Sequence, residues 1–263
     1  MKFNVHTFFW SGEIERSGII VLIPEVAPKL LVSLSTRASP LEGIVTMVTK
    51  MYLTAYNVAQ SLVWSAALVL SVRSIVENGG SLTSVYDDAG WFVRLGQCSA
   101  VMEVLHSLLG LVRSPVLTAL MQWAGRTHAI MAVIHPIESL HGTTAAALMF
   151  LAWSLSEVIR YPSYALGANI PGWLNWLRYS AFIPLYPIGG SAEIWLMYHS
   201  LPTIDARVPY TFSMPNAFNA AFYYPWFLRG LLYVYPFLLL KLYLYVFVQR
   251  KKKLVSDKGK KNS

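Results

Sequence analysis

Cysteine and charged residues are scarce in this sequence. Cys98 is the single cysteine in 263 residues, which excludes an intrachain disulfide and a metal cluster built on cysteines. Charged residues make up 13% of the chain, whereas about 25% is usual in soluble domains. Hydrophobic residues make up 55%. This composition predicts a protein that crosses a membrane several times.

The positive charge is concentrated near the C-terminus. The formal net charge is +8, and seven of the 21 basic residues lie between Arg250 and Lys261. Because this basic tail follows an apolar segment, it indicates the cytosolic flank of a membrane helix and not a surface for nucleic acid. Lys260 and Lys261 also stand fourth and third from the end. That spacing matches the dilysine retrieval signal of endoplasmic reticulum membrane proteins.

Six apolar segments predict an all-α fold, a bundle of six transmembrane helices. They cover residues 52–72, 95–112, 116–134, 144–160, 177–198 and 226–248. Several are short for a hydrocarbon layer of about 30 Å, so their polar side chains are expected to face one another. The polar stretch 73–94 and the proline-rich stretch 199–225 are predicted loops.

These segments divide the chain into three parts. Residues 1–48 are expected to form an irregular or interfacial extension, because prolines and charges interrupt their apolar run. Residues 49–249 form the predicted membrane domain, and residues 250–263 form the basic tail. Six spans with a cytosolic tail place the N-terminus in the cytosol as well.

The fifth segment carries a carboxylate inside an apolar run. A charged side chain there costs about 2.5–3.5 kcal/mol to insert, so Glu193 is expected to serve a site or a pairing. Tyr186 lies seven positions earlier. Seven residues make nearly two helical turns, which would put both side chains on one face about 10 Å apart along the axis. Pro187 and Gly189 are expected to kink the helix and to free carbonyl groups at a cavity.

Two interpretations of Tyr186 and Glu193 follow from this spacing. A phenol and a carboxyl on one buried face are able to act as an acid–base pair. Alternatively, Glu193 pairs with a neighbouring helix and Tyr186 belongs to an aromatic belt at the membrane interface.

A second group of polar residues lies at the end of the fourth segment. Glu157 and Arg160 are three positions apart, so they can form an ion pair on one helix face. A structural ion pair is one interpretation. The other is that Arg160 presents its guanidinium to a phosphate-bearing ligand at the cytosolic side.

A third group of polar residues lies in the second and third predicted helices: Glu103, His106, Arg113, Arg126 and His128. Cross-bracing between helices is the favoured interpretation, and a metal site formed by Glu103, His106 and His128 is the alternative. Their spacing is not diagnostic of a metal site.

One motif imitates a phosphatase. His106-Ser107, five residues and Arg113-Ser114 have the spacing of the cysteine phosphatase signature, HCx5RS. Ser107 stands where the thiolate is required, and a serine hydroxyl has no accessible anionic form near neutral pH. The five intervening residues, LLGLV, are typical of a membrane helix and not of a phosphate-binding loop. We therefore exclude phosphatase activity.

Three stretches resemble the membrane (3R)-3-hydroxyacyl-CoA dehydratases of very-long-chain fatty acid elongation, once called protein-tyrosine-phosphatase-like proteins. The family's catalytic tyrosine and glutamate lie in a Y-P-x-G-x-x-x-E motif, which corresponds here to Tyr186 and Glu193. Gly125 departs from the family pattern, which has serine before the arginine. The resemblance covers roughly residues 50–248, and its stretches are MEVLHSLLGLVRSPVLTALMQ (102–122), WSLSEVIRYPSYAL (153–166) and WLRYSAFIPLYPIGGSAE (176–193).

The resemblance implies an enzyme of the endoplasmic reticulum membrane that removes water from 3-hydroxyacyl-CoA to give trans-2-enoyl-CoA. It implies no metal and no redox cofactor, and partners among the other elongation enzymes, the condensing enzyme and the reductases. The acyl chain would lie between the helices in contact with membrane lipid. Arg160 and Arg178 are the candidates to bind the anionic CoA head at the cytosolic side.

This reaction needs one group that takes the C2 proton and another that protonates the departing C3 hydroxyl. Glu193 is favoured as the base and Tyr186 as the donor, and the opposite assignment stays open. An acyl-CoA isomerase or hydratase would use the same pair. The alternative from another class is a catalytically inactive membrane scaffold or lipid-binding protein of the same fold.

Overall fold

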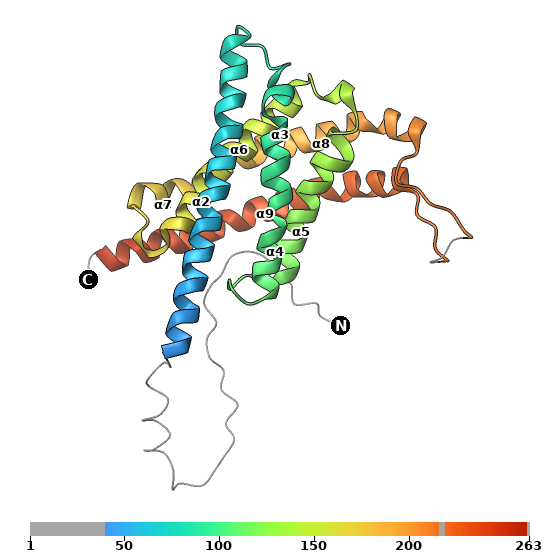
Figure 1. Ribbon diagram of the computed structural model, residues 1–263. Coiled ribbons are helices and arrows are strands. Elements are labelled where there is room, and N and C mark those ends of the chain that lie inside the picture. Colours follow the sequence, from blue (N-terminus) through green and yellow to red (C-terminus); the bar gives the residue numbers. More distant parts are fainter. Residues whose placement is uncertain (1–39, 216–218, 262–263) are drawn as a thin grey trace.

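The computed structural model describes residues 40–215 and 219–261, and the regular structure in them is helical (Figure 1). The one sheet-type pairing in these residues is an isolated bridge between Phe212 and Phe222. The predicted all-α class is thereby confirmed for the described part of the chain. The expectation for residues 1–39 lies outside it.

The first described helix, α2 (Pro40–Glu77), is longer than the predicted segment 52–72. Residues 40–48 are helical, so the prediction of an irregular extension is wrong for them. Proline is favoured in the first turn of a helix, where its missing N–H has no partner to lose. The helix also continues past residue 72, and its last turns carry an exposed Arg73–Glu77 ion pair at 2.7 Å.

The loop predicted at 73–94 is much shorter in the structure. Helix α3 (Val85–Ser99) occupies its second half. Val85, Ala89 and Val93 recur every four residues and are fully buried, which is the pattern of a helix face packed against a core. The polar residues that suggested a loop are Asp87 and Asp88, and they stand in the first turn, where negative charge stabilises a helix.

The remaining segments are also divided differently from the prediction. The third becomes an α-helix followed by a π-helical turn, and the fifth becomes a short helix followed by a long one. Helix α8 continues to Arg207 through Pro202, so the loop predicted at 199–225 is wrong for its first nine residues. The elements are α4 (Val101–Leu108), α5 (Val116–Thr127), η1 (His128–Ile134), α6 (Thr144–Leu166), α7 (Gly172–Arg178), α8 (Phe182–Arg207) and α9 (Tyr224–Lys261).

Helix α8 passes through Pro187 without a break, which corrects the expected interruption. Proline has no N–H, so the carbonyl of Ile183, four residues earlier, loses its partner within the helix. The hydroxyl of Tyr243 on α9 donates to this carbonyl at 3.0 Å. A side chain of the neighbouring helix thus satisfies the group that proline frees.

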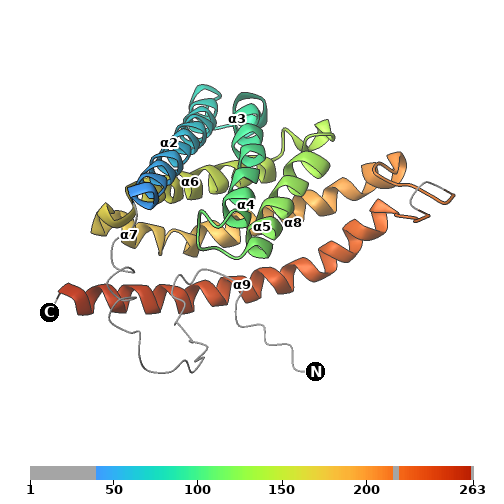
Figure 2. The same ribbon diagram turned by 60° about the horizontal axis from the view of Figure 1, so that its bottom comes forward.

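Helices α8 and α9 lie side by side and both cross the direction of α2 (Figures 1 and 2). Helix α6 packs against α2 on one side and α8 on the other. At the end of α8, Arg229 of α9 binds both carboxylate oxygens of Asp205, at 2.9 and 2.6 Å. At the other end, Arg250 Nε of α9 donates to Ser180 Oγ at 3.2 Å, just before α8 begins. These contacts fix an antiparallel α8–α9 pair.

Among the described residues, two helices are long and apolar enough to cross a membrane by their length and composition, over Glu42–Glu77 and Tyr224–Val248. They correspond to the first and sixth predicted segments. Large apolar side chains of α9 are exposed, including Phe237 at 65% and Leu240 at 58%. An exposed apolar helix surface of this kind is consistent with contact with lipid. The count of six spans stays a prediction.

Candidate active site

The carboxylate of Glu193 is held between two neighbouring helices. Its side chain projects from α8, and the residue is 8% exposed. Trp153 Nε1 on α6 donates to Glu193 Oε1 at 2.8 Å. On the other side, the hydroxyl of Tyr235 on α9 donates to Oε2. Each carboxylate oxygen therefore has one donor, and each donor comes from a different helix.

Small residues before Glu193 allow this close approach. A Cβ atom on Gly189 would lie 3.5 Å from the Cβ of Ala152 on α6. A Cβ atom on Gly190 would lie 2.8 Å from Leu239 Cδ1 on α9, closer than such atoms normally come. The two glycines bring both helices near the α8 backbone, so that an indole and a phenol reach the same carboxylate.

Tyr186 lies on the same side of α8 as Glu193. Its ring stacks on that of Tyr243, with centroids 5.6 Å apart and an interplanar angle of 21°. Tyr243 and Tyr235 are both on α9, so Tyr186 and Glu193 both face that helix. This arrangement agrees with the predicted shared face. Within the described residues, the hydroxyl of Tyr186 has no hydrogen-bond partner, and the side chain is half-buried.

A network of ion pairs lies beside this site. Glu157 is 2% exposed and accepts hydrogen bonds from Arg126 of α5 and from Arg160 Nε, the latter at 2.5 Å. Arg160 also donates to both carboxylate oxygens of Glu103 on α4, at 3.1 and 3.3 Å. The structural ion pair predicted for Glu157 and Arg160 is confirmed. Two acids and two bases balance the charge of the network, which joins three helices.

Arg126 connects this network to the carboxylate of Glu193. Its guanidinium carbon lies 4.2 Å from the centroid of the Trp153 ring, within the range of a cation–π contact. Nε and Nη2 of Arg126 are buried without a hydrogen-bond partner in the part of the chain that the structure describes. The arginine that neutralises Glu157 thus also covers one face of the indole that binds Glu193.

The other polar residues of the second and third segments bind separate partners. His106 Nε2 lies 2.9 Å from the hydroxyl of Tyr52 on α2, and His128 Nε2 lies 2.8 Å from that of Tyr224 on α9. Glu103 is bound to Arg160, and Arg126 is bound to Glu157. The predicted cross-bracing between helices is therefore confirmed for these residues and the two histidines, whereas the side chain of Arg113 is exposed. The described residues contain no group of three His, Cys, Asp or Glu side chains that could hold a metal ion.

The phosphatase-like motif forms a helix end and not a phosphate site. Ser107 Oγ donates to the carbonyl of Glu103 at 3.0 Å and lies 2.5 Å from Ser114 Oγ. The side chain of Arg113 is exposed. Ser107 belongs to the last turn of α4, and the helix expected through LLGLV ends at Leu108.

A basic cluster lies near the ends of α6 and α7 and the start of α8, beside the C-terminal half of α9. The Tyr164 ring lies 4.8 Å from the Arg178 guanidinium carbon and 5.8 Å from that of Arg160. Arg250 joins them through its hydrogen bond to Ser180. The structure therefore brings together Arg160 and Arg178, the two candidates for the CoA end. It adds Arg250, which the sequence suggested only as part of the tail.

A separate polar cluster lies outside this site. The hydroxyl of Tyr86 accepts a hydrogen bond from Arg94 Nη1 at 2.9 Å and lies 2.9 Å from His135 Nδ1. The Tyr86 ring stacks on His141 with centroids 3.7 Å apart. Burial lowers the pKa of the His135 imidazole, and the neighbouring Arg94 and His141 lower it further. This cluster shares no residue with the Glu193 site.

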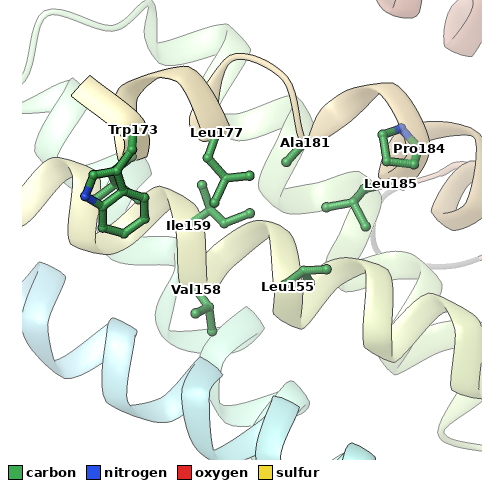
Figure 3. Close-up of a pocket in the computed structure, with 9 residues that line it drawn as sticks. Leu155, Val158, Ile159, Trp173, Leu177, Ala181, Pro184 and Leu185 are labelled. Atoms are coloured by element: carbon green, nitrogen blue, oxygen red, sulfur yellow. The ribbon is translucent and has the colours of Figure 1, made fainter. Parts of the chain in front are cut away.

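An apolar pocket of about 420 Å³ lies between α6, α7 and the start of α8 (Figure 3). Pro184 and Leu185 are among its lining residues and directly precede Tyr186. Neither Tyr186 nor Glu193 lines it. The full lining is Leu155, Val158, Ile159, Trp173, Leu174, Leu177, Ala181, Pro184 and Leu185.

These features describe a helical protein, consistent with a membrane protein, in which a buried carboxyl and a phenol on the same helix form a candidate acid–base pair. Residues 97–256 match the protein tyrosine phosphatase-like family, PTPLA. The chain belongs to this family. The family name implies no phosphatase chemistry here, because Ser107 stands at the position of the thiolate.

Curated relatives carry the name of one enzyme. The very-long-chain (3R)-3-hydroxyacyl-CoA dehydratase hpo-8 of Caenorhabditis elegans is 38% identical over 82% of this chain and 100% of its own length. The dehydratase PASTICCINO 2 of Arabidopsis thaliana is 34% identical over 82% and 98%. Human very-long-chain (3R)-3-hydroxyacyl-CoA dehydratase 2 is 33% identical over 76% and 80%. No solved structure matches the chain.

Sequence reasoning missed both donors to Glu193. Trp153 is the first residue of one of the family-like stretches, and this position was a signal for a role at the site. Tyr235 stands in an apolar segment with several other tyrosines, among them Tyr233 and Tyr243. Nothing in its local pattern separates it from tyrosines of a membrane interface.

Breaking the ion-pair network is expected to destabilise the protein. Glu157→Gln removes the carboxylate between two guanidinium groups, and loss of one partner of a buried ion pair costs about 3–5 kcal/mol. Thermal unfolding of the purified variant in detergent should occur at clearly lower temperature. Glu77→Gln is the control, because the Arg73–Glu77 pair is more than half exposed and should contribute nothing measurable. An unchanged melting temperature for Glu157→Gln would contradict the role of the network.

Proposed function

We propose that this protein removes water from very-long-chain (3R)-3-hydroxyacyl-CoA to give trans-2-enoyl-CoA in fatty acid elongation. The curated relatives that share most of their length with this chain are named for that activity. The observation that carries the proposal is the buried carboxyl of Glu193, which faces α9 together with Tyr186 on the same helix. The tyrosine and the glutamate of the Y-P-x-G-x-x-x-E motif thus lie on one face of one helix.

In the proposed mechanism, Glu193 takes the proton from C2 of the substrate. The electron pair of the C2–H bond forms the C2–C3 double bond, and the C3–O bond breaks. The departing hydroxyl leaves as water with the proton of the Tyr186 hydroxyl. Return of the proton from Glu193 to Tyr186 restores both groups. Exchange of the two roles gives the same products and remains an alternative.

The contacts of both residues support Glu193 as the base and Tyr186 as the proton donor. A carboxylate has about four lone-pair positions, and Trp153 and Tyr235 occupy one on each oxygen of Glu193. A lone pair therefore stays available on each oxygen to accept a proton. The hydroxyl of Tyr186 has no partner among the described residues and is available to a substrate.

Arg178 is the proposed contact for the anionic CoA head. Arg160 belongs to the same cluster, but its guanidinium already donates to Glu157, Glu103 and Tyr161. We therefore assign Arg160 mainly to the ion-pair network, and Arg178, whose guanidinium lies over the Tyr164 ring, is the proposed contact for the CoA end. The other enzymes of the elongation cycle are the proposed partners, because each step passes its acyl-CoA product to the next.

The inactive-scaffold alternative explains the helices but gives no reason for the site. A scaffold needs no carboxylate at 8% exposure with an unoccupied lone pair on each oxygen. Insertion of such a group into hydrocarbon is unfavourable, so its presence favours an enzymatic role.

The catalytic pair is tested by conservative substitutions. Glu193→Gln keeps the shape but cannot take the proton, and Tyr186→Phe removes only a hydroxyl. Each should lower kcat by about 10²–10⁴-fold in folded protein. The double variant should be little worse than the poorer single one, because residues that act as a unit are not additive. Tyr198→Phe is the control, since this tyrosine of α8 is 62% exposed. Near-normal turnover by folded Glu193→Gln would refute the assignment and favour the scaffold.

The CoA end is tested by comparing two arginines. Arg178→Gln should raise KM for the acyl-CoA several-fold with little change in kcat, because it removes binding energy that the ground state and transition state share. Arg160→Gln should instead reduce the amount of folded protein, because Glu103 and Glu157 lose their partner. Steady-state kinetics and size-exclusion profiles in detergent distinguish the two. An unchanged KM for folded Arg178→Gln would exclude it from the CoA site.

The proposed location is the endoplasmic reticulum membrane, with six spans and both termini in the cytosol. Tags at either end should be removed by protease from sealed microsomes, whereas a protected tag would contradict this topology.

Replacing Lys260 and Lys261 by serine should weaken retrieval to the endoplasmic reticulum if the dilysine signal operates. Unchanged localisation of that variant would assign retention to another signal.

A further inference from the structure

The two donors to Glu193 are not part of the family-like motif that contains it. Trp153 approaches from α6 and Tyr235 from α9, and they bind different oxygens of the carboxylate. Side-chain rotation of Glu193 would break both hydrogen bonds at once. The pair therefore restricts the carboxylate to one orientation, with its remaining lone pairs in fixed directions.

Each donor is held independently of Glu193. The Trp153 residue is 4% exposed, and the Arg126 guanidinium lies against its ring at 4.2 Å. Arg126 in turn is bound by Glu157. Tyr235 is packed against the hydrophobic core, near the position where Gly190 approaches Leu239. Donors anchored in this way are able to impose a direction on the carboxylate instead of following it.

The two tyrosines near Glu193 also differ in their hydrogen bonding. Tyr235 provides the hydrogen bond to the carboxylate, whereas Tyr186 stacks on Tyr243 and has no such bond within the described residues. If Tyr186 were the partner of Glu193, its hydroxyl would be occupied and less available to the substrate. The contact with Tyr235 leaves the Tyr186 hydroxyl available.

We infer that Trp153 and Tyr235 are positioning residues that orient the carboxylate of Glu193 for proton transfer. This inference rests on the proposed function, in which Glu193 exchanges a proton with the substrate. Neither residue needs to touch the substrate, and both act through Glu193. Their contribution belongs to the transition state, because small errors in the position of a reacting group reduce rate more than binding.

The expected effect is a loss of turnover with unchanged binding. A displacement of a reacting group by about 1 Å can lower the rate by about 10²-fold. Tyr235→Phe and Trp153→Phe should each lower kcat by about 10- to 100-fold and change KM less than about twofold. Tyr233→Phe is the matched control, because this tyrosine lies on the same helix and is 76% exposed. It should behave like the parent protein.

A double-mutant cycle separates positioning from a structural role. The full-length protein is purified in detergent and assayed with a long-chain 3-hydroxyacyl-CoA. In a Glu193→Gln background, Tyr235→Phe should cause no further loss of the residual turnover, because it acts only through the carboxylate. A structural role would lower the melting temperature and reduce turnover by the same factor in both backgrounds.

Each outcome gives a distinct answer. Normal kcat for folded Tyr235→Phe and Trp153→Phe, with Glu193→Gln impaired, would overturn the inference and leave the proposed function intact. Normal kcat for folded Glu193→Gln would instead overturn the proposed function. If Tyr235→Phe fails to fold, Trp153→Phe provides the same test on the other oxygen. Failure of both variants to fold would also overturn the inference, because it would assign the two contacts to stability.

Discussion

The buried carboxylate of Glu157 is the constraint on which the other parts of the structure depend. Taking a charge out of water costs several kcal/mol unless opposite charges bind it. Arg126 and Arg160 provide those charges from α5 and α6, and Arg160 adds Glu103 of α4. Because the charges balance only when these helices meet, the network fixes their relative positions. Arg126 then covers Trp153, so the same ion pair that joins the helices also positions a donor to Glu193.

The part of α8 around Glu193 is contacted by α6 on one side and by α9 on the other. Glycines allow α6 and α9 to come close, and a tyrosine of α9 satisfies the carbonyl that Pro187 frees. A run of proline and glycine is usually a helix breaker. Here the glycines lack side-chain bulk, so α6 and α9 can approach the α8 backbone. The hydroxyl of Tyr243 on α9 replaces the backbone N–H that Pro187 lacks. The result is a continuous helix whose carboxylate and phenol keep the relation that seven residues of helix dictate.

The sequence predicted the all-α class and the shared face of the candidate pair, Tyr186 and Glu193, but not the contacts that hold these two side chains. The spacing of Tyr186 and Glu193 is a local property of one helix, and the ion pair of Glu157 with Arg160 is local as well. The extent of α3 was missed because Asp87 and Asp88 suggested a loop, although they stabilise a helix N-terminus. Tyr235 and Trp153 were missed because their roles depend on three segments meeting, which no periodicity within one segment encodes.

The most direct test of the account is to incubate the purified protein in detergent with a long-chain (3R)-3-hydroxyacyl-CoA and to follow the products by mass spectrometry. The account predicts trans-2-enoyl-CoA, a loss of one water from the substrate, and formation of this product about 10²–10⁴-fold more slowly by folded Glu193→Gln. Folded wild-type protein that binds the substrate but forms no enoyl-CoA would contradict the account and identify the protein as a binding protein of the same fold.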